Sequence, residues 1–297
     1  MAYRFLKKDR GVEAAVRRIA REQVDGALAA ITAQDTDKAT HEVRKACKKL
    51  RALLRLVRPG FADFARENAA LRDLARALSG SRDAKVLLDT FDWLTAEVPE
   101  EEIQRLAAVR SALAAGQHAR PDELLRGAEA ELMAVRERIA GWVLEEHGWD
   151  ALAPGLREAV RGGRKAARQA HREPTAERYH ELRKLMKHHW YHTRLLAPLW
   201  PAVMRTRIAE LGRLADLLGL HHDVSVFMDR LAGGFADEEA EVAIGALSTL
   251  AAARRADLER KIDPLAARLL AQKGGALAKQ WHELWRIWRA GRMSAKG

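Results

Sequence analysis

The chain has 297 residues, of which 48% are hydrophobic and 31% charged. Its 52 Lys and Arg residues outnumber 41 Asp and Glu residues, which leaves a net charge of +11 at pH 7. This composition is rich enough in apolar residues to build a core, which excludes a disordered polyelectrolyte, and its charge favours polyanionic partners such as nucleic acid, acidic lipid or a phosphate polymer. Cys47 is the single cysteine, so an intrachain disulfide and a thiolate metal cluster are excluded, and we expect a small buried apolar residue there.

The sequence predicts an all-α protein. Ala, Leu, Arg and Glu dominate, strand-like alternation is nearly absent, and Pro and Gly residues divide the chain into segments of helical period. In chain order, helices are expected near residues 10–33, 36–58, 61–79, 82–96, 100–117, 121–146, 155–171, 175–197, 201–219, 222–232, 236–272 and 276–291. In this reading Asp83 and Asp223 cap the helices that they begin.

A basic helical motif occurs twice. His41-Glu-Val-Arg44-Lys45 and His180-Glu-Leu-Arg183-Lys184 lie 139 positions apart, and Leu78 with Asp83 matches Leu218 with Asp223 at an offset of 140. We interpret this as an internal duplication. The predicted organisation is a single domain over residues 5–290, made of a first helical half (5–147) and a second (150–290).

Turning the motif residues through about 100° each places cations on one arc of the helix and apolar residues on the other. The polar arc of the first copy holds His41, Arg44, Lys45, Lys48, Arg51, Arg55 and Arg58; that of the second holds His180, Arg183, Lys184, Lys187, Tyr191 and Arg194. Lys49 of the first motif and His188 of the second are further candidates for binding. A solvated helix face would mix charges of both signs, whereas the only acidic residues of these arcs are Glu42 in the first copy and Glu181 in the second. Like charges on adjacent turns therefore indicate a binding surface for an anion. His189, His192 and Thr193 lean toward the packed side of the second copy, whose surface is less charged.

More cations precede each motif by about 20 residues. If each helical hairpin packs antiparallel, they could widen the basic surface, although ordinary surface positions explain them equally well. These residues are Arg17, Arg18 and Arg21 before the first copy and Arg161, Arg164, Lys165 and Arg168 before the second.

Signatures of catalysis are missing from the sequence. There is no phosphate-binding GxxxxGK[ST] loop, and Lys45 and Lys184 stand where an HExxH zinc motif needs its second histidine. His188 with His192, and His221 with His222 and Asp223, have spacings that a metal site could use, but buried or surface histidines are the simpler interpretation. His41 and His180 have three possible roles: they donate hydrogen bonds to phosphate, they fix the start of the helix or, in the rarest case, they carry a phosphoryl group as nucleophiles. We therefore expect a protein that is not an enzyme and that has no cofactor or metal.

These residues carry a resemblance to the CHAD family, the conserved histidine α-helical domain. It rests on the twin HxxRKxxK helices and on the segments Leu78 to Asp83 and Leu218 to Asp223, and it covers roughly residues 5–290. The resemblance implies two four-helix-bundle-like halves related by a pseudo-two-fold axis, with a basic central surface that binds inorganic polyphosphate. The resemblance implies name-giving histidines at His41 and His180, and basic residues at Arg44, Lys45, Lys48, Arg51 and Arg55 in the first copy and at Arg183, Lys184, Lys187 and Arg194 in the second. Trp190 stands where the first copy has Arg51, which departs from the basic pattern.

We therefore expect a targeting or scaffolding protein that binds polyphosphate, with polyphosphate granules or a phosphate-metabolising enzyme as further partners. A cytoplasmic location, without a membrane span and with granule association, fits the composition. The alternatives are a nucleic-acid-binding helical protein and an accessory of phosphate metabolism with metal-binding histidines. Only 6% of residues are aromatic, and Trp281, Trp285 and Trp288 have the spacing of a packing face rather than of a base-stacking row.

Overall fold

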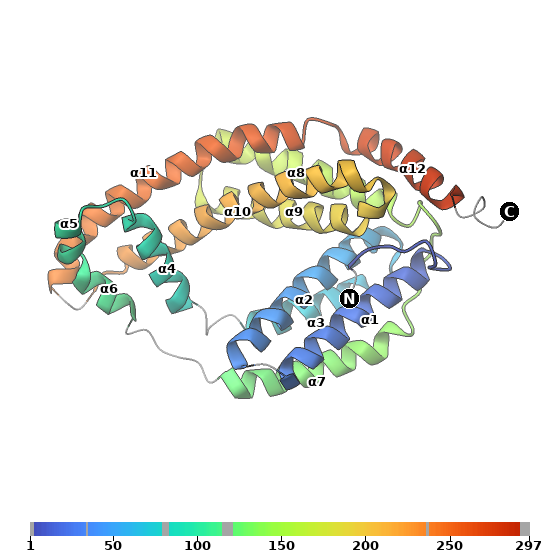
Figure 1. Ribbon diagram of the computed structural model, residues 1–297, viewed down its shortest axis with the longest axis horizontal. Coiled ribbons are helices and arrows are strands. Elements are labelled where there is room, and N and C mark those ends of the chain that lie inside the picture. The colour runs from blue at the N-terminus through green and yellow to red at the C-terminus, as the bar shows by residue number, and fades with distance from the viewer. Residues whose placement is uncertain (1–2, 34, 79–82, 115–120, 236–237, 292–297) are drawn as a thin grey trace.

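The computed structural model describes residues 3–33, 35–78, 83–114, 121–235 and 238–291, and these are helical with no strand (Figure 1). The all-α prediction is confirmed. The α-helices are α1 (Val12–Ala33), α2 (Thr36–Val57), α3 (Phe64–Ala77), α4 (Asp83–Thr95), α5 (Glu100–Arg105), α6 (Ala107–Ala114), α7 (Pro121–Ile139), α8 (Ala153–Arg172), α9 (Ala176–Leu195), α10 (Pro201–Ala232), α11 (Glu238–Leu269) and α12 (Gly274–Ala290). Two 3₁₀ turns, η1 (Arg58–Gly60) and η3 (Ala197–Leu199), follow the two motif helices.

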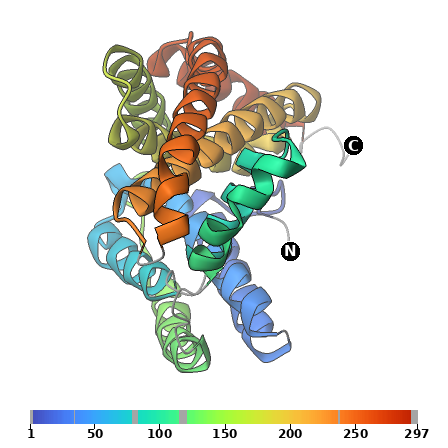
Figure 2. The ribbon, with the colours of Figure 1, turned by 90° about the vertical axis from the view of Figure 1, so that its left-hand side faces the viewer.

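The helices form two layers that meet along α2. In Figure 1, α1, α2, α3 and α7 lie together at the bottom, whereas α8 to α12 lie above them, and the end-on view of Figure 2 shows the same separation. Helix α2 packs against α1, α3 and α7 on one side and against α8 and α9 on the other. The motif helices α2 and α9 are therefore neighbours at the centre of the molecule. The pseudo-two-fold relation between the halves stays a prediction.

Helices α4 and α6 come from the first half of the sequence but pack against the long α10–α11 hairpin of the second (Figure 1). Part of the predicted first half, 5–147, thus packs against the predicted second half, 150–290.

Three predicted helix boundaries are wrong. Residues 201–219 and 222–232 form one continuous helix, α10, so Asp223 lies inside a helix and does not cap one. A single glycine at 219 costs a helix only about 1 kcal/mol, and burial of Leu218, Val224 and Phe227 along α10 offsets that cost. The cap predicted at Asp83 lies outside the described side chains, although α4 begins at that residue.

The other two boundaries differ in the first half. The segment 100–117 is divided into α5 and α6, and its residues 115–117 lie outside the described part of the chain. Helix α7 ends at Ile139 rather than near 146, because the chain turns so that Trp142 packs on Phe61 with 5.3 Å between ring centroids.

The two layers touch through a glycine at the start of α8. A Cβ atom on Gly155 would lie 2.0 Å from the carbonyl oxygen of Leu56, so only glycine lets the backbones of α8 and α2 approach this closely. The tryptophans of α12 are buried: Trp281, Trp285 and Trp288 are at most 8% exposed, which confirms the predicted packing face.

Candidate anion-binding surface

Helix α2 is built from one apolar and one basic face. The carboxylate of Asp35 accepts a hydrogen bond of 2.9 Å from the backbone N–H of Lys38 and so caps the helix. Val43, Cys47 and Leu50 are fully buried along the apolar face. Burial raises the pKa of Cys47 to about 12, so the thiol stays neutral and packs as the small apolar residue that the sequence predicts.

Helix α9 begins in the same way, because the hydroxyl of Thr175 accepts a 3.3 Å hydrogen bond from the N–H of Arg178. Its packed face carries polar groups. His189, His192 and Thr193 are completely buried, as their helical positions predict.

The two motif helices contact each other directly and run antiparallel. Nε2 of the buried His192 donates a hydrogen bond of 2.8 Å to the carbonyl oxygen of Ala52 at the centre of this contact. On one side of it, Lys49 and Arg194 lie 5.7 and 6.0 Å from the ring centroid of Tyr3. On the other side, Arg55 and His188 line one small cavity. Side chains that are 145 residues apart (Lys49 and Arg194) and 133 residues apart (Arg55 and His188) are thereby gathered on one surface.

We define the motif surface as Lys48, Lys49, Arg51 and Arg55 of α2 together with Lys187, His188 and Arg194 of α9. The α2 members crowd one another. Burial lowers the pKa values of Arg51 and Arg55, and the charge of Arg55 lowers that of Arg51 further. Burial also lowers the pKa of Lys49, and Lys45 and Arg194 add to the effect. Three partly buried cations therefore repel their neighbours, which is the arrangement that an anion relieves.

Two of these α2 cations contact neutral groups. Arg51 donates to the side-chain oxygen of Asn68 at 3.2 Å, and Lys49 donates to that of Gln23 at 2.8 Å, so both cations have neutral partners. The Nε atom of Arg55 is buried and has no hydrogen-bond partner in the described part of the chain. A buried guanidinium donor without an acceptor costs free energy that a phosphate oxygen would recover.

The two cations that α9 contributes to the motif surface lie over an aromatic ring. Lys187 Nζ and the guanidinium carbon of Arg194 lie 4.8 and 4.7 Å from ring centroids of Trp190, which holds both by cation–π attraction. Burial lowers the pKa of Lys187, Asp216 partly offsets this effect, and Arg183 and Arg194 lower the pKa further.

His188 and His192 contribute no permanent charge. Burial lowers the pKa of His188 well below its ordinary value, with Arg55 as the next cause. Burial also lowers the pKa of His192 to about 4. At neutral pH both rings are therefore neutral, and His188 can act as a hydrogen-bond donor but not as a cation.

The histidines that begin the two motifs have different environments. His41 is exposed, whereas His180 is partly buried with its Nδ1 atom 3.2 Å from Nδ1 of His222. Burial and then the His222 ring lower the pKa of His180 to about 4. One Nδ1 atom of this pair must donate to the other, which fixes the His180 ring against α10.

Arg44 is held at the end of α3, where its guanidinium donates to the carbonyl oxygen of Leu78 at 2.7 Å. This bond satisfies a carbonyl left open by the end of the helix. Arg183 occupies the corresponding place on α10, where its guanidinium lies 3.9 Å from the position of a Cβ atom on Gly219. The guanidinium of Arg44 thus lies against the end of α3, and that of Arg183 lies against α10.

Lys45 and Lys184 are exposed and each pairs with the glutamate three residues earlier. Lys45 Nζ lies 2.9 Å from the Glu42 carboxylate, and Lys184 is joined to Glu181 in the same way. Each pair neutralises one motif cation.

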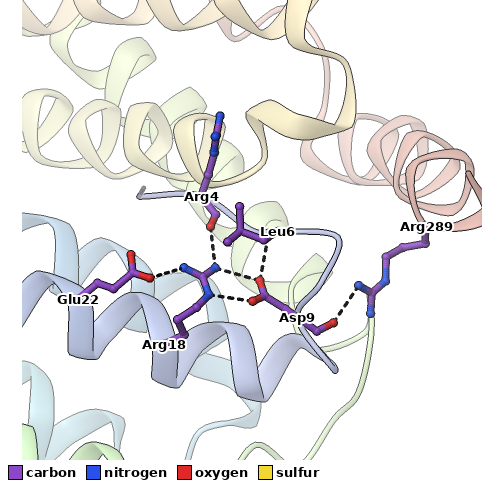
Figure 3. Close-up of polar contacts among 6 residues, drawn as sticks. All are labelled: Arg4, Leu6, Asp9, Arg18, Glu22 and Arg289. Atoms are coloured by element: carbon purple, nitrogen blue, oxygen red, sulfur yellow. Dashed lines mark hydrogen bonds and ion pairs between the residues drawn. The ribbon is translucent and has the colours of Figure 1, made fainter. Parts of the chain in front are cut away.

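The arginines of α1 are divided between internal contacts and solvent. Arg17 lies 2.9 Å from Glu13 and donates to the carbonyl oxygen of Trp142. Arg18 donates to both carboxylate oxygens of Asp9, at 2.8 and 2.9 Å, and to Glu22 at 3.0 Å (Figure 3). The same Asp9 accepts from Arg289 of α12 through its backbone carbonyl, so this network fastens the amino-terminal segment. Arg21 is exposed.

The basic residues of α8 are mostly exposed. Arg161, Lys165 and Arg168 face solvent, whereas Arg164 donates to the carbonyl oxygens of Leu270 and Ala271 at the end of α11. Arg164 therefore has a structural role that the sequence did not indicate.

Sequence reasoning missed Tyr3 and Asn68. The Tyr3 hydroxyl donates to the carbonyl oxygen of Lys49 at 2.8 Å, and its ring lies edge-on to Tyr191 at 5.7 Å. Both residues lie outside the repeated motif, so no spacing could have linked them to it.

The described residues contain no group of three or more His, Cys, Asp or Glu side chains placed to hold a metal ion, so His188 with His192 and His221 with His222 do not form such a group. None of the helices described is long and apolar enough to cross a membrane.

The family model described as the CHAD domain matches residues 13–232, which is most of the chain. The fold is similar to the crystal structure of the CHAD domain from the plant Ricinus communis, with a TM-score of 0.64 and 18% sequence identity over 92% of this chain and 96% of that one. No curated protein matches the chain. With its two motif helices packed together at the centre of an all-helical fold, the chain belongs to the CHAD domain family.

Proposed function

We propose that this protein binds inorganic polyphosphate on the motif surface and that it does so without catalysing a reaction. The observation that carries the proposal is the crowding of Lys49, Arg51 and Arg55, whose pKa values are lowered by burial and by neighbouring cations. A folded protein holds such charges together at a cost, and a polyanion recovers that cost by replacing repulsion with charge-assisted hydrogen bonds.

Polyphosphate fits this surface better than nucleic acid does. A phosphate polymer offers oxygens of one charge along its whole length, and guanidinium groups bind such oxygens bidentately. Single-stranded nucleic acids also need aromatic platforms for base stacking. The rings of Trp190 and Tyr191 on α9 face cations, but Lys187 and Arg194 already lie over Trp190, and Arg194 also lies over Tyr191.

A targeting or scaffolding role follows from binding without chemistry. His180 is paired with His222 and its pKa is lowered to about 4, which suits a neutral hydrogen-bonding ring rather than a phosphoryl acceptor assisted by an acid and a base. Granules of polyphosphate or a phosphate-metabolising enzyme are the partners that such a role would serve.

The test is a calorimetric titration with long-chain polyphosphate, tripolyphosphate and duplex DNA, each at two salt concentrations. We expect polyphosphate to remain bound at physiological salt while DNA dissociates, because DNA engages the surface only through general attraction to phosphate charge. Equal, salt-sensitive binding of all three polyanions would contradict a dedicated polyphosphate surface.

A further inference from the structure

A second basic surface lies outside the motif helices, in a groove between α8 and the amino end of α12. Its volume is about 640 Å³, and arginines from one face of α8 line it together with Lys273. These arginines are Arg157, Arg161, Arg164 and Arg168, spaced by four, three and four residues so that they share one side of the helix. Among the lining residues, Glu158 is the single acid.

The groove has a rigid frame and exposed cations. A Cβ atom on Gly274 would lie 2.7 Å from the carbonyl oxygen of Arg157, so the backbone of α12 rests directly on α8. Arg164 fastens the end of α11 to the same helix. Arg157 and Lys273 are exposed, and the described residues provide neither of them with a hydrogen bond or an ion pair to an acid. Their charges are available to a ligand.

The groove adjoins the motif surface. A smaller cavity of about 120 Å³ lies among Arg55, Arg58 and His188, and it shares Glu158 with the groove. Pro59, which lines the groove, directly follows Arg58. A polyanion bound along α2 as far as Arg55 therefore contacts the cations of the groove if it extends past the carboxylate of Glu158.

We propose that long polyphosphate chains pass Glu158 and occupy this groove, so that the groove makes the protein selective for chain length. The proposal rests on polyphosphate binding at the motif surface. From Arg157 to Arg168 the groove follows about 16 Å of helix, at 1.5 Å per residue. Only a long polyphosphate chain can cover this distance while it also occupies the motif surface. Once one part of the polymer is bound, its second contact is intramolecular and raises affinity without requiring a new encounter. Tripolyphosphate is too short to bind both regions.

The experiment compares tripolyphosphate with long-chain polyphosphate on the full chain. In the variant Arg157→Glu/Lys273→Glu we expect affinity for the long chain to fall about tenfold or more, since two charge-assisted contacts are lost, with tripolyphosphate affinity within about twofold of the original. The matched control is Arg126→Glu/Lys8→Glu, which changes one exposed arginine and one exposed lysine outside both surfaces. It should change the ratio of the two affinities little.

A variant of opposite sign keeps the test independent of folding defects. Glu158→Gln removes the acid that lines both the groove and the cavity beside Arg55, so we expect it to strengthen long-chain binding more than tripolyphosphate binding. Thermal unfolding followed by circular dichroism shows whether each variant is folded. Loss of tripolyphosphate and long-chain binding in equal measure, or no change in either variant, would overturn the groove as an extension. Failure of the unmodified protein to bind either polymer would instead overturn the proposed function.

Discussion

Helices α2 and α9 carry the same motif but present it differently. Arg51 and Arg55 of α2 are crowded by like charge, whereas Lys187 and Arg194 of α9 lie over the ring of Trp190. Lys49 of α2 is a cation, and its counterpart His188 is a neutral ring because burial lowers its pKa. The comparison teaches that a repeated sequence does not imply a repeated charge density. We expect α2 to contribute most of the affinity for polyphosphate, and α9 to contribute neutral hydrogen-bond donors and the contour of the surface.

The strongest way to break this comparison is to reverse matched pairs of charges. Arg51→Glu/Arg55→Glu on α2 should weaken polyphosphate binding about a hundredfold, because two crowded donors become repulsive acids. Lys187→Glu/Arg194→Glu on α9 should cost about tenfold, since these cations are already partly satisfied by Trp190. Titration calorimetry measures both losses. Arg44 is left intact because its bond to Leu78 supports α3. Losses of equal size would show that the two copies contribute alike.

A second prediction concerns the loss of stability in acid, which should come from a histidine of α9 and not from α2. The pKa of His192 is about 4 in the folded protein and 6.5 without burial, so the unfolded chain binds its proton more readily. The contribution of His192 to the free energy of unfolding is therefore fully present above pH 6.5 and is lost as the pH falls toward 4. This loss amounts to up to about 3 kcal/mol.

The variant His192→Leu tests this because α2 has Leu53 at the corresponding position. Denaturant unfolding at pH 7 and pH 5 should show a smaller loss of stability on acidification in the variant. The loss of the hydrogen bond to Ala52 should cost about 1 kcal/mol at pH 7. An unchanged difference between the two pH values would assign the acid sensitivity to other groups.

The smallest expected effect sharpens the comparison by making α9 resemble α2. Trp190→Arg removes the ring that holds Lys187 and Arg194 and adds a guanidinium at the position of Arg51. We expect polyphosphate to bind about three- to tenfold more tightly, with a steeper dependence on salt because one more cation participates.

The variant also loses the hydrogen bond of 3.1 Å from the indole to Ile208, so its melting temperature should fall. Binding is therefore measured well below that temperature. A salt dependence identical to that of the original protein would indicate that Trp190 does not limit the charge of α9.

The sequence by itself determined the helical class, the two basic helices and the family. Helical period and composition suffice for this because an amphipathic face is local: residues three and four positions apart lie together whatever the rest of the chain does. The buried positions of Cys47, His189 and His192 follow from the same rule. The sequence did not show that residues 201–232 form one continuous helix, α10, because burial of side chains along the helix outweighs the cost of Gly219.

Only the tertiary structure decided which cations are available to a ligand. Arg44, Arg164 and Arg18 have the same charge in the sequence as Arg55, yet each is bonded to a carbonyl or carboxylate oxygen that lies outside its own helix. The groove lined by Arg157 and Lys273 likewise requires α8 and α12 to meet at Gly274. A helical pattern fixes which side of a helix a charge occupies, but its partner depends on which other helix packs there.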